Sequence, residues 1–300
     1  MTKAAIAILG PGAVGGFLAS VLKRAGNDVV CIASNQVAAG IKQDGIRLES
    51  GIFGNFVARP RSASRLQESP EFLLITVKAT GLSEALDRVD SGLVKETVIV
   101  PFLNGIEHME VLRRRFGPRV IAGAISIEVF RRSPQYAVHS SPSARITLAS
   151  DNGLLRPATE DALNLFRSAG LETGRGESEA QILWEKLIRL NALACATTVS
   201  GKTIGELRGD PYSRKALESL VAEACAVAAA EGVLLYPAES MAYFDAMGTG
   251  QRSSMHRDFV AGKALELDAI AGAIIRRAEK NGIACPTINR FIDEIESRLH

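Results

Sequence analysis

The 300-residue sequence has few cysteines, few aromatic residues and almost no net charge. Lysine and arginine number 35 against 33 aspartate and glutamate, a formal net charge of +2. A nucleic-acid binder usually concentrates basic residues on one face, and this even distribution does not suggest one. The cysteines lie far apart without a CxxC pair, which favours small buried side chains over disulfides or metal ligands. They are Cys31, Cys195, Cys225 and Cys285.

Long hydrophobic runs are also missing. A membrane-spanning helix needs roughly 18 consecutive apolar residues, which no stretch of the sequence offers. The apolar run Ala4–Leu9 stops at Gly10-Pro11-Gly12, too early for a signal peptide. The hydrophobic fraction of 47% is ordinary for a globular chain. We therefore expect a cytoplasmic protein that binds neither metal, nucleic acid nor membrane.

The first 150 residues alternate short apolar runs with helical patterns. The runs predict strands at residues 4–9, 28–33, 72–77, 97–103 and 120–127, with helices at 14–25, 36–43, 81–90 and 107–116. Strands that are apolar on both faces and separated by helices predict a parallel sheet covered on both sides. Two further runs, Tyr136–Ser141 and Ala144–Ala149, predict a hairpin at the edge of that sheet.

Strand patterns disappear after about residue 175. Patterns rich in Ala, Leu and Glu predict helices at 179–200, 211–231, 237–247, 255–281 and 287–299. Gly174-Arg175-Gly176 is a suitable junction. The sequence thus predicts an α/β parallel-sheet domain at 1–174 and an all-α domain at 175–300. The apolar C-terminal helices leave open whether they form a homodimer interface or pack on the first domain.

The first expected strand runs into a G-x-G-x-x-G motif made of Gly10, Pro11, Gly12, Ala13, Val14 and Gly15. In a Rossmann-type domain the first glycine permits a tight turn, the second the approach of a pyrophosphate, and the third close packing of helix on strand. The pyrophosphate then binds the unpaired N–H groups of the helix. The position predicts dinucleotide binding; a purely structural turn is the alternative.

The end of the second expected strand bears on the choice of dinucleotide. An NAD site usually has Asp or Glu there, about 20 residues after the motif, to accept hydrogen bonds from the ribose 2′-OH. The sequence Cys31–Gln36 contains no carboxylate, and Ser34 and Asn35 can donate hydrogen bonds to a 2′-phosphate. No arginine supplies positive charge there. NADP(H) is the favoured cofactor.

Lys186 lies in an apolar stripe of the expected helix 179–200, together with Ile182, Leu190, Leu193 and Thr197. Burial of a lysine weakens its hold on the proton, which suits a proton donor to a carbonyl oxygen. The alternative is a lysine at the domain edge whose amine reaches water.

A polar segment, Gly248–Asp258, leads into the expected helix Met255–Asn281 and includes its first turn. Ser253 or Ser254 could be its N-cap. Glu266 shares a helix face with apolar residues, an unusual setting for a carboxylate, although a surface or capping role would also explain it.

Asn104-Gly105 follows an expected strand at its carboxyl end. Ligands of open α/β sheets bind at this edge. As a turn signal, however, Asn-Gly is common.

Six motifs follow one another along the chain: G-x-G-A-x-G at 10–15, Val77-Lys78-Ala79, Asn104-Gly105, Trp184-Glu185-Lys186-Leu187, Ser253-Ser254-Met255 with Asp258, and the segment Glu266–Gly272. Their order and spacing resemble the ketopantoate reductase (2-dehydropantoate 2-reductase) family over nearly the whole chain. The resemblance implies a Rossmann domain, a helical domain and NADPH-dependent reduction of a 2-oxo acid in the cleft between them. It also implies a role in pantothenate biosynthesis.

The resemblance also implies roles for individual residues. Lys186 matches the proton donor, and Ser254 matches a serine that binds the substrate carboxylate. Glu266 matches a glutamate near the cofactor and the catalytic lysine. Asn104 matches an asparagine that touches nicotinamide and substrate, and Lys78 a lysine on the cofactor side.

The sequence departs from the family pattern in two places. The family usually has arginine at about Ser34, to bind the 2′-phosphate. It also has asparagines where this chain has Leu190 and Ala194; Asn191, one step away, is the substrate-binding residue we expect instead. An unpaired substrate hydroxyl there costs about 1–3 kcal/mol, so a less polar carbonyl substrate is a second hypothesis. A non-catalytic NADP(H)-binding sensor is the third.

Overall fold

The computed structural model describes residues 4–299 and divides the chain into two compact units. Unit 1 comprises Met1–Leu103 and His108–Ile182, and unit 2 comprises Asn104–Glu107 and Leu183–His300. The predicted domain boundary at residue 174 stays a prediction. Sequence analysis did not predict that the short segment Asn104–Glu107 groups with the second half of the chain.

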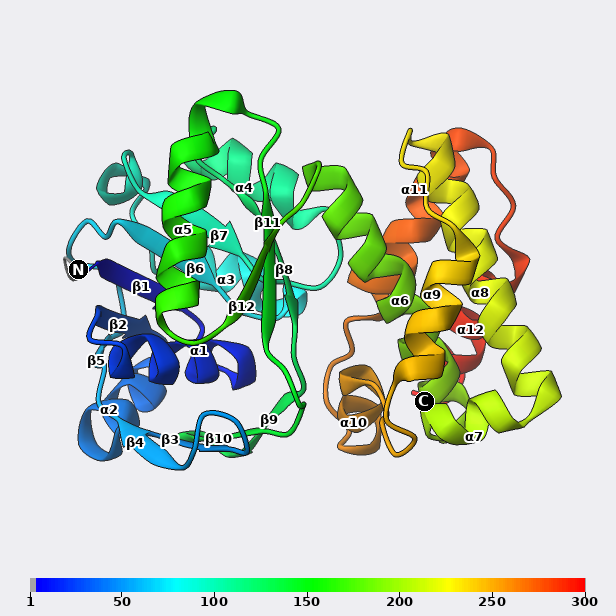
Figure 1. Cartoon of the computed structure of the whole chain (residues 1–300), viewed down its shortest axis with the longest axis horizontal. Coiled ribbons are helices and arrows are strands. Elements are labelled where there is room, and N and C mark those ends of the chain that lie inside the picture. Colours follow the sequence, from blue (N-terminus) through cyan, green and yellow to red (C-terminus); the bar gives the residue numbers. More distant parts are fainter. Residues whose placement is uncertain (1–3, 300) are drawn as a thin grey trace. The chain divides into compact units, whose positions relative to one another are not determined.

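Unit 1 is built around a five-stranded sheet in the order β5-β2-β1-β6-β7 (Figure 1). Its strands pair in parallel throughout. They are β1 (Ala5–Leu9), β2 (Asp28–Ile32), β5 (Arg61–Ala63), β6 (Phe72–Ile75) and β7 (Val98–Pro101). The strands β1, β6 and β7 are almost entirely buried, as their continuous apolar runs require when helices cover both faces. The predicted parallel sheet is confirmed for four of its five strands. The fifth predicted strand, at residues 120–127, lies in another sheet, where it pairs antiparallel. Its place in the parallel sheet is taken by β5, which sequence analysis did not predict.

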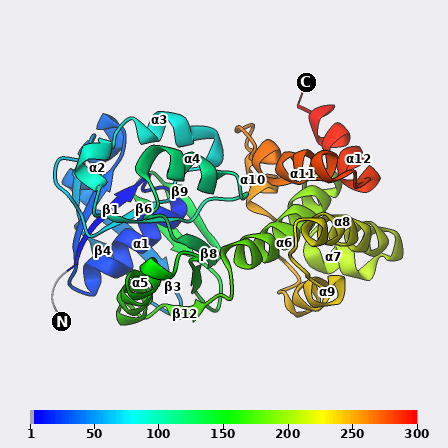
Figure 2. The same cartoon turned by 90° about the horizontal axis from the view of Figure 1, so that it is seen from above.

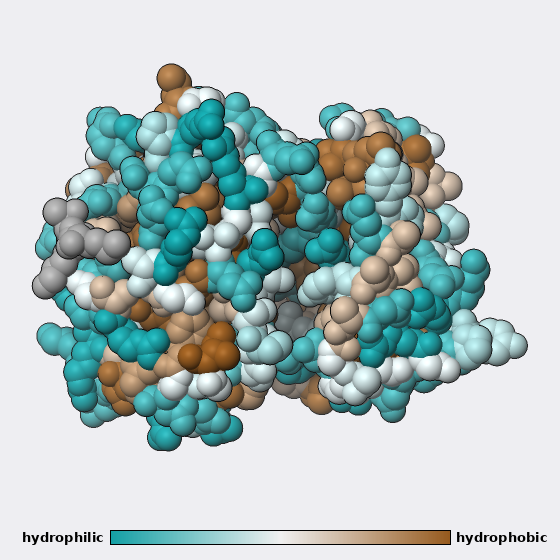
Figure 3. Space-filling model, viewed as in Figure 1, coloured by the Kyte–Doolittle hydropathy of each residue, from teal (hydrophilic) through white to brown (hydrophobic). Residues whose placement is uncertain are grey.

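The connecting helices of this sheet begin after its strands. They are α1 (Ala13–Arg24), α2 (Asn35–Asp44), α3 (Leu82–Leu86) and α4 (His108–Phe116). Figure 2 shows α3 and α4 on one side of β1 and β6 and α1 on the other. A further helix, α5 (Arg156–Ser168), which sequence analysis did not anticipate, turns a mainly hydrophilic surface outward (Figure 3).

Two smaller sheets complete unit 1, and they show that the predicted hairpin is wrong. β10 (Tyr136–His139) pairs with β3 (Ile46–Ser50) and β9 (Val129–Ser133), and β4 (Phe56–Ala58) pairs with β3. β11 (Arg145–Ala149) pairs instead with β8 (Ala122–Ser126) and β12 (Glu172–Arg175). The chain between β10 and β11 bends where Ser141 Oγ donates to the Ser143 carbonyl (2.7 Å), so each strand finds partners in a different sheet.

Unit 2 is helical. Its elements are residues 183–200 of α6 (Glu179–Ser200), then α7 (Ile204–Gly209), α8 (Pro211–Ala230), α9 (Pro237–Ala246), α10 (Ser254–Val260), the π-helical turn η4 (Asp268–Gly272), α11 (Ala273–Asn281) and α12 (Pro286–Glu296). Within residues 4–299, no helix combines the length and the apolar character that crossing a membrane requires.

The single helix predicted for Met255–Asn281 is wrong, because the chain leaves the helical path after α10. Gly262 adopts a left-handed conformation (φ +62°), and the Lys263 N–H returns to the Asp258 carbonyl (2.9 Å). This is a common way for a helix to end at glycine. Glu266 therefore lies in the connection before η4 and not on the face of a long helix.

Candidate functional site

The glycine turn between β1 and α1 has the backbone that its three glycines suggest. Gly10 has φ +85°, and a Cβ there would collide with Val77; a Cβ at Gly15 would collide with Thr76 and the Gly10 carbonyl. Thr76 Oγ1 donates to that carbonyl at 2.8 Å. The turn is therefore held against the chain that follows β6, and at these two positions only glycine fits.

Gly12 is different because the space around it is open. The one atom within 4 Å of a Cβ built there is the Gly10 carbonyl oxygen, at 3.9 Å. Gly12 is the N-cap of α1, whose first turn carries no acidic residue. The Gly12 N–H donates to the Gly10 carbonyl at 2.7 Å. The N–H groups of the first helical turn have no partner within a helix, and a helix start with room beside it suits an anion. The residues of the turn thus fit the pyrophosphate of a dinucleotide.

Ser34 and Lys78 follow neighbouring strands of the sheet in unit 1. Ser34 comes after β2 and is the N-cap of α2, accepting a bond from the Val37 N–H at 3.5 Å. Lys78 comes after β6 and precedes a 3₁₀ turn. Both residues are exposed. Because β1, β2 and β6 are parallel, the glycine turn, Ser34 and Lys78 lie along one edge of the sheet, where ligands of this fold bind.

Lys186 in α6 is half-buried. Burial lowers its pKa to about 8, and the nearby negative charge of Glu266 offsets part of that effect. Desolvation disfavours the ammonium form, and here it outweighs the attraction of the carboxylate. A lysine with this pKa still carries its proton at neutral pH and releases it more readily than an exposed lysine does.

Asn104 and Glu266 meet directly in unit 2, although 162 positions separate them along the chain. Asn104 Nδ2 donates to Glu266 Oε2 at 2.9 Å. Glu266 is buried, with 7% of its surface exposed. Together with the charge effect on Lys186, this bond unites three residues that the sequence singled out separately. We call Asn104, Lys186 and Glu266 the polar group.

The segment Asn104–Glu107 is attached to η4 and α11 by contacts that sequence analysis missed. Arg276 donates to both carboxylate oxygens of Glu107, at 2.9 and 2.7 Å, and to Asp268 at 2.6 Å. A Cβ at Gly105 (φ +83°) would collide with the Ala269 carbonyl. Gly105 was thus the one feature of the sequence that could have indicated how closely this segment approaches Ala269.

The two serines at the start of α10 have different roles. Ser253 is buried and is the N-cap, because its Oγ accepts from the His256 N–H at 3.0 Å. The same Oγ shares a hydrogen bond with Thr197 Oγ1 at 2.7 Å. Ser254, the first residue of the helix, is exposed. Its side chain is available to a ligand, and its binding of the substrate carboxylate stays a prediction.

Asn191 is completely buried. Its Oδ1 accepts from Cys195 Sγ at 3.5 Å, and its Nδ2 has no hydrogen-bond partner in the described part of the chain. The predicted contact of Asn191 with substrate is untested, and it would require this part of α6 to open. Leu190, next to Asn191 in α6, is half-buried and Ala194 is buried, so the positions four and eight residues after Lys186 are both apolar.

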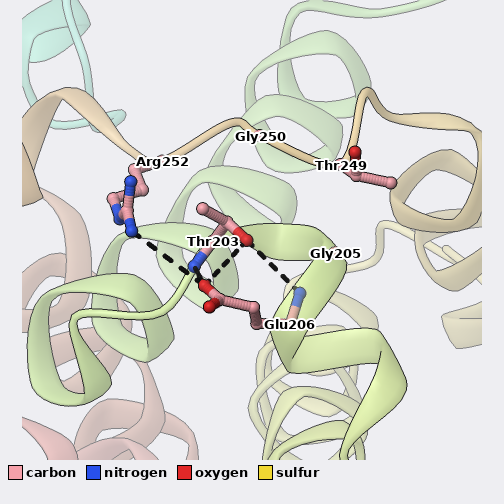
Figure 4. A pocket seen from close by; sticks show the side chains of 6 residues that line it. All are labelled: Thr203, Gly205, Glu206, Thr249, Gly250 and Arg252. Atoms are coloured by element: carbon pink, nitrogen blue, oxygen red, sulfur yellow. Dashed lines mark hydrogen bonds and ion pairs between the residues drawn. The ribbon is translucent and has the colours of Figure 1, made fainter.

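A separate polar pocket of about 470 Å³ lies in unit 2 (Figure 4). It is lined by Thr203, Gly205, Glu206, Thr249, Gly250 and Arg252. Glu206 accepts from the Thr203 N–H at 2.7 Å, completing a capping box at the start of α7, and lies 4.0 Å from Arg252. The lining includes no residue that sequence analysis proposed for the site.

Two family models match the chain. Ketopantoate reductase PanE/ApbA matches residues 6–153, and its C-terminal counterpart matches residues 180–298. The chain belongs to the ketopantoate reductase family. The 2-dehydropantoate 2-reductase of Caulobacter vibrioides is 30% identical, and the uncharacterized oxidoreductase YkpB of Bacillus subtilis is 29% identical; each match covers 94% of both chains.

A solved structure of D-mandelate dehydrogenase, with NADH and anilino(oxo)acetate, shares the fold (TM-score 0.91, 21% identity, 98% of each chain covered). Membership of the ketopantoate reductase family confirms the predicted class, an oxidoreductase with an NADP(H)-binding Rossmann fold. The roles predicted for individual residues remain predictions, as does the location in the cytoplasm.

Proposed function

We propose that this member of the ketopantoate reductase family reduces a 2-oxo acid to a 2-hydroxy acid with NADPH, and that 2-dehydropantoate is the substrate. The observation that carries the proposal is the polar group, in which Asn104 is bonded to Glu266 and Glu266 acts on the charge of Lys186. A buried carboxylate beside an amide and a half-buried ammonium is a costly arrangement for stability alone.

Lys186 is the proton donor in this proposal. When bound, NADPH supplies the hydride that a carbonyl carbon accepts. The Lys186 ammonium, with a pKa of about 8, gives its proton to the carbonyl oxygen as negative charge develops there. The amine that remains regains a proton from water. Hydride and proton together convert the ketone to the alcohol.

The other residues hold the reacting groups in place. Asn104 binds the carbonyl, and Glu266 fixes the Asn104 amide by accepting from its Nδ2. The charge of Glu266 also favours the ammonium form of Lys186. Ser254, exposed at the start of α10, binds the substrate carboxylate. In unit 1, the turn Gly10–Gly15 binds the pyrophosphate, and Ser34 and Lys78 bind the adenosine side of NADP(H).

The test is consumption of NADPH and of NADH against a panel of 2-oxo acids that includes 2-dehydropantoate. We expect turnover of 2-dehydropantoate with NADPH in preference to NADH. Absence of turnover with every carbonyl compound, in a protein that binds NADPH tightly, would favour the non-catalytic sensor.

A less polar substrate is the second candidate. Leu190 and Ala194 occupy the positions where the family pattern has asparagines, and an apolar surface leaves the hydroxyl of ketopantoate without a partner. The related D-mandelate dehydrogenase structure holds anilino(oxo)acetate, which makes phenylglyoxylate a useful member of the panel. A higher kcat/KM for phenylglyoxylate than for 2-dehydropantoate, reversed in Leu190→Asn, would establish this candidate.

A further inference from the structure

The residues after β2 offer the 2′-phosphate of NADP(H) hydrogen bonds but no charge. Ser34 is the residue nearest the expected ribose position, and Asn35 and Gln36 follow it. A phosphate monoester carries between one and two negative charges at neutral pH. The inference below rests on the proposed cofactor and asks which residues of unit 1 neutralise that charge.

The neighbouring strand β5 ends beside β2. The two strands are parallel, with Ile32 opposite Ala63, and the Ala33 N–H donates to the Ala63 carbonyl at 3.1 Å. The residues that follow each strand therefore emerge at the same edge of the sheet. Ser34 follows β2 there, and Ser64 and Arg65 follow β5. Arg65 is exposed.

A second arginine reaches this edge from the chain after α3. Arg88 Nη1 lies 3.4 Å from the Ala33 carbonyl and 3.4 Å from the Ser64 carbonyl. The Arg88 carbonyl accepts from the Leu66 N–H at 2.9 Å, which fixes its backbone beside the same loop. The guanidinium is thus held next to the residues that directly precede Ser34 and Arg65.

The acidic groups near Arg88 leave it able to bind an anion. Arg88 Nη2 pairs with Glu84 at 3.0 Å, but the Glu84 side chain is 81% exposed, and exposed pairs of this kind are weak. Asp28 lies at the start of β2, the opposite end of the strand from Ser34, where it pairs with Arg61 at 2.8 Å. A guanidinium has five donors, so Arg88 can keep its carbonyl contacts and still bind a phosphate.

We propose that Arg88 and Arg65 bind the 2′-phosphate of NADP(H), with the Ser34 hydroxyl as a further donor. The positive charge then comes from the β5 side of the strand pair and not from an arginine after β2. Selection for NADPH over NADH is a property of the β2–β5 edge, and Glu84 opposes it by competing for Arg88.

Binding of two small nucleotides tests this without any turnover. Calorimetric titration with 2′,5′-ADP and with 5′-AMP separates the 2′-phosphate from the rest of the adenosine site. We expect Arg88→Gln and Arg65→Gln each to weaken 2′,5′-ADP binding about tenfold or more, the loss of a hydrogen-bonded charge pair, and to leave 5′-AMP binding unchanged. Arg156→Gln, an exposed arginine of α5, is the control for net charge and should change neither. Glu84→Gln should tighten 2′,5′-ADP binding severalfold.

The outcomes are distinguishable. Equal weakening of both nucleotides in Arg88→Gln means that Arg88 only supports the edge, which overturns its part in the inference. Unchanged 2′,5′-ADP binding in both arginine variants overturns the inference altogether. If the wild-type protein binds 5′-AMP as tightly as 2′,5′-ADP, the 2′-phosphate has no subsite, although a dinucleotide site remains. If it binds neither nucleotide nor NADPH, the proposed function itself fails.

Discussion

The glycine turn and the polar group are built in opposite ways. The turn consists of six consecutive residues, and its three glycines have no side chains. The missing side chain leaves open space beside Gly12 and allows the tight contacts at Gly10 and Gly15. The polar group uses three side chains from distant parts of the chain. We therefore expect the turn to lose cofactor binding when atoms are added to it, and the polar group to lose its chemistry when atoms are removed from it.

The largest effect should come from removing the ammonium of the polar group. Lys186→Met keeps an apolar chain of similar length in the helix, and we expect the rate of reduction to fall by about 10²- to 10⁴-fold, the usual contribution of a general acid. NADPH affinity should stay unchanged, because the lysine acts on the substrate oxygen. Single-turnover kinetics and fluorescence titration of NADPH measure the two quantities.

Lys215→Met is the matched control, because Lys215 is an exposed lysine of α8 in the same unit. It should react at the wild-type rate. Loss of NADPH binding in Lys186→Met with an unchanged chemical step would assign Lys186 to the cofactor and break the comparison.

The second prediction adds a single methyl group to the turn. Gly12→Ala has room for its Cβ within the protein, so the thermal unfolding midpoint should change little. The methyl occupies the space in which a pyrophosphate approaches the helix, and NADPH affinity should fall about tenfold to a hundredfold through lost bonds to a charged group. Calorimetric titration gives the affinity. Gly153→Ala, also in open space but outside the site, should leave it unchanged; a Gly12→Ala protein with wild-type affinity would contradict the assignment of the turn.

These two regions also differ in how well the sequence foretold them. The turn could be located from the spacing of its glycines, because a strand, a tight turn and a helix start are local structures. The parallel sheet followed from apolar runs for the same reason. In the polar group, residue types and the family resemblance pointed to Asn104, Lys186 and Glu266, but no local pattern shows that an amide will meet a carboxylate 162 positions away.

The errors have the same origin. The predicted helix Met255–Asn281 is wrong because Gly262 is left-handed and ends α10 nearby. A glycine within a helical pattern does not show from sequence alone whether the helix ends there. The predicted hairpin failed because β10 and β11 each pair with strands remote in sequence. The ion pair between Glu107 and Arg276 spans 169 positions. The hydrophobic pattern of neither segment could predict it.

The third prediction concerns pH. Reduction needs the ammonium form of Lys186, whose pKa is about 8, so kcat/KM should be flat below this pH and fall as pH rises above it. One unit above the pKa about one-tenth of the ammonium remains. Steady-state rates between pH 6 and 10, in roughly half-unit steps, give the profile, and NADPH affinity over the same range is the control. A profile that stays flat to about pH 10 would remove Lys186 from the proton transfer.

The smallest effect should come from loosening the support of the polar group. Arg276 touches neither substrate nor cofactor in our proposal; it positions Asn104 by holding Glu107 of the same segment. Arg276→Gln should lower kcat about threefold to tenfold through misplacement of the amide, while leaving the KM for NADPH unchanged. Arg276→Lys keeps the charge but loses the two-pronged contact, so it should restore part of the rate. Arg277→Gln is the matched control, because this adjacent arginine pairs with Glu231 instead, at 2.9 Å. If Arg276→Gln and Arg277→Gln lower kcat equally, ion pairs of α11 merely stabilise unit 2, and the attachment of Asn104 to η4 does not govern the chemistry.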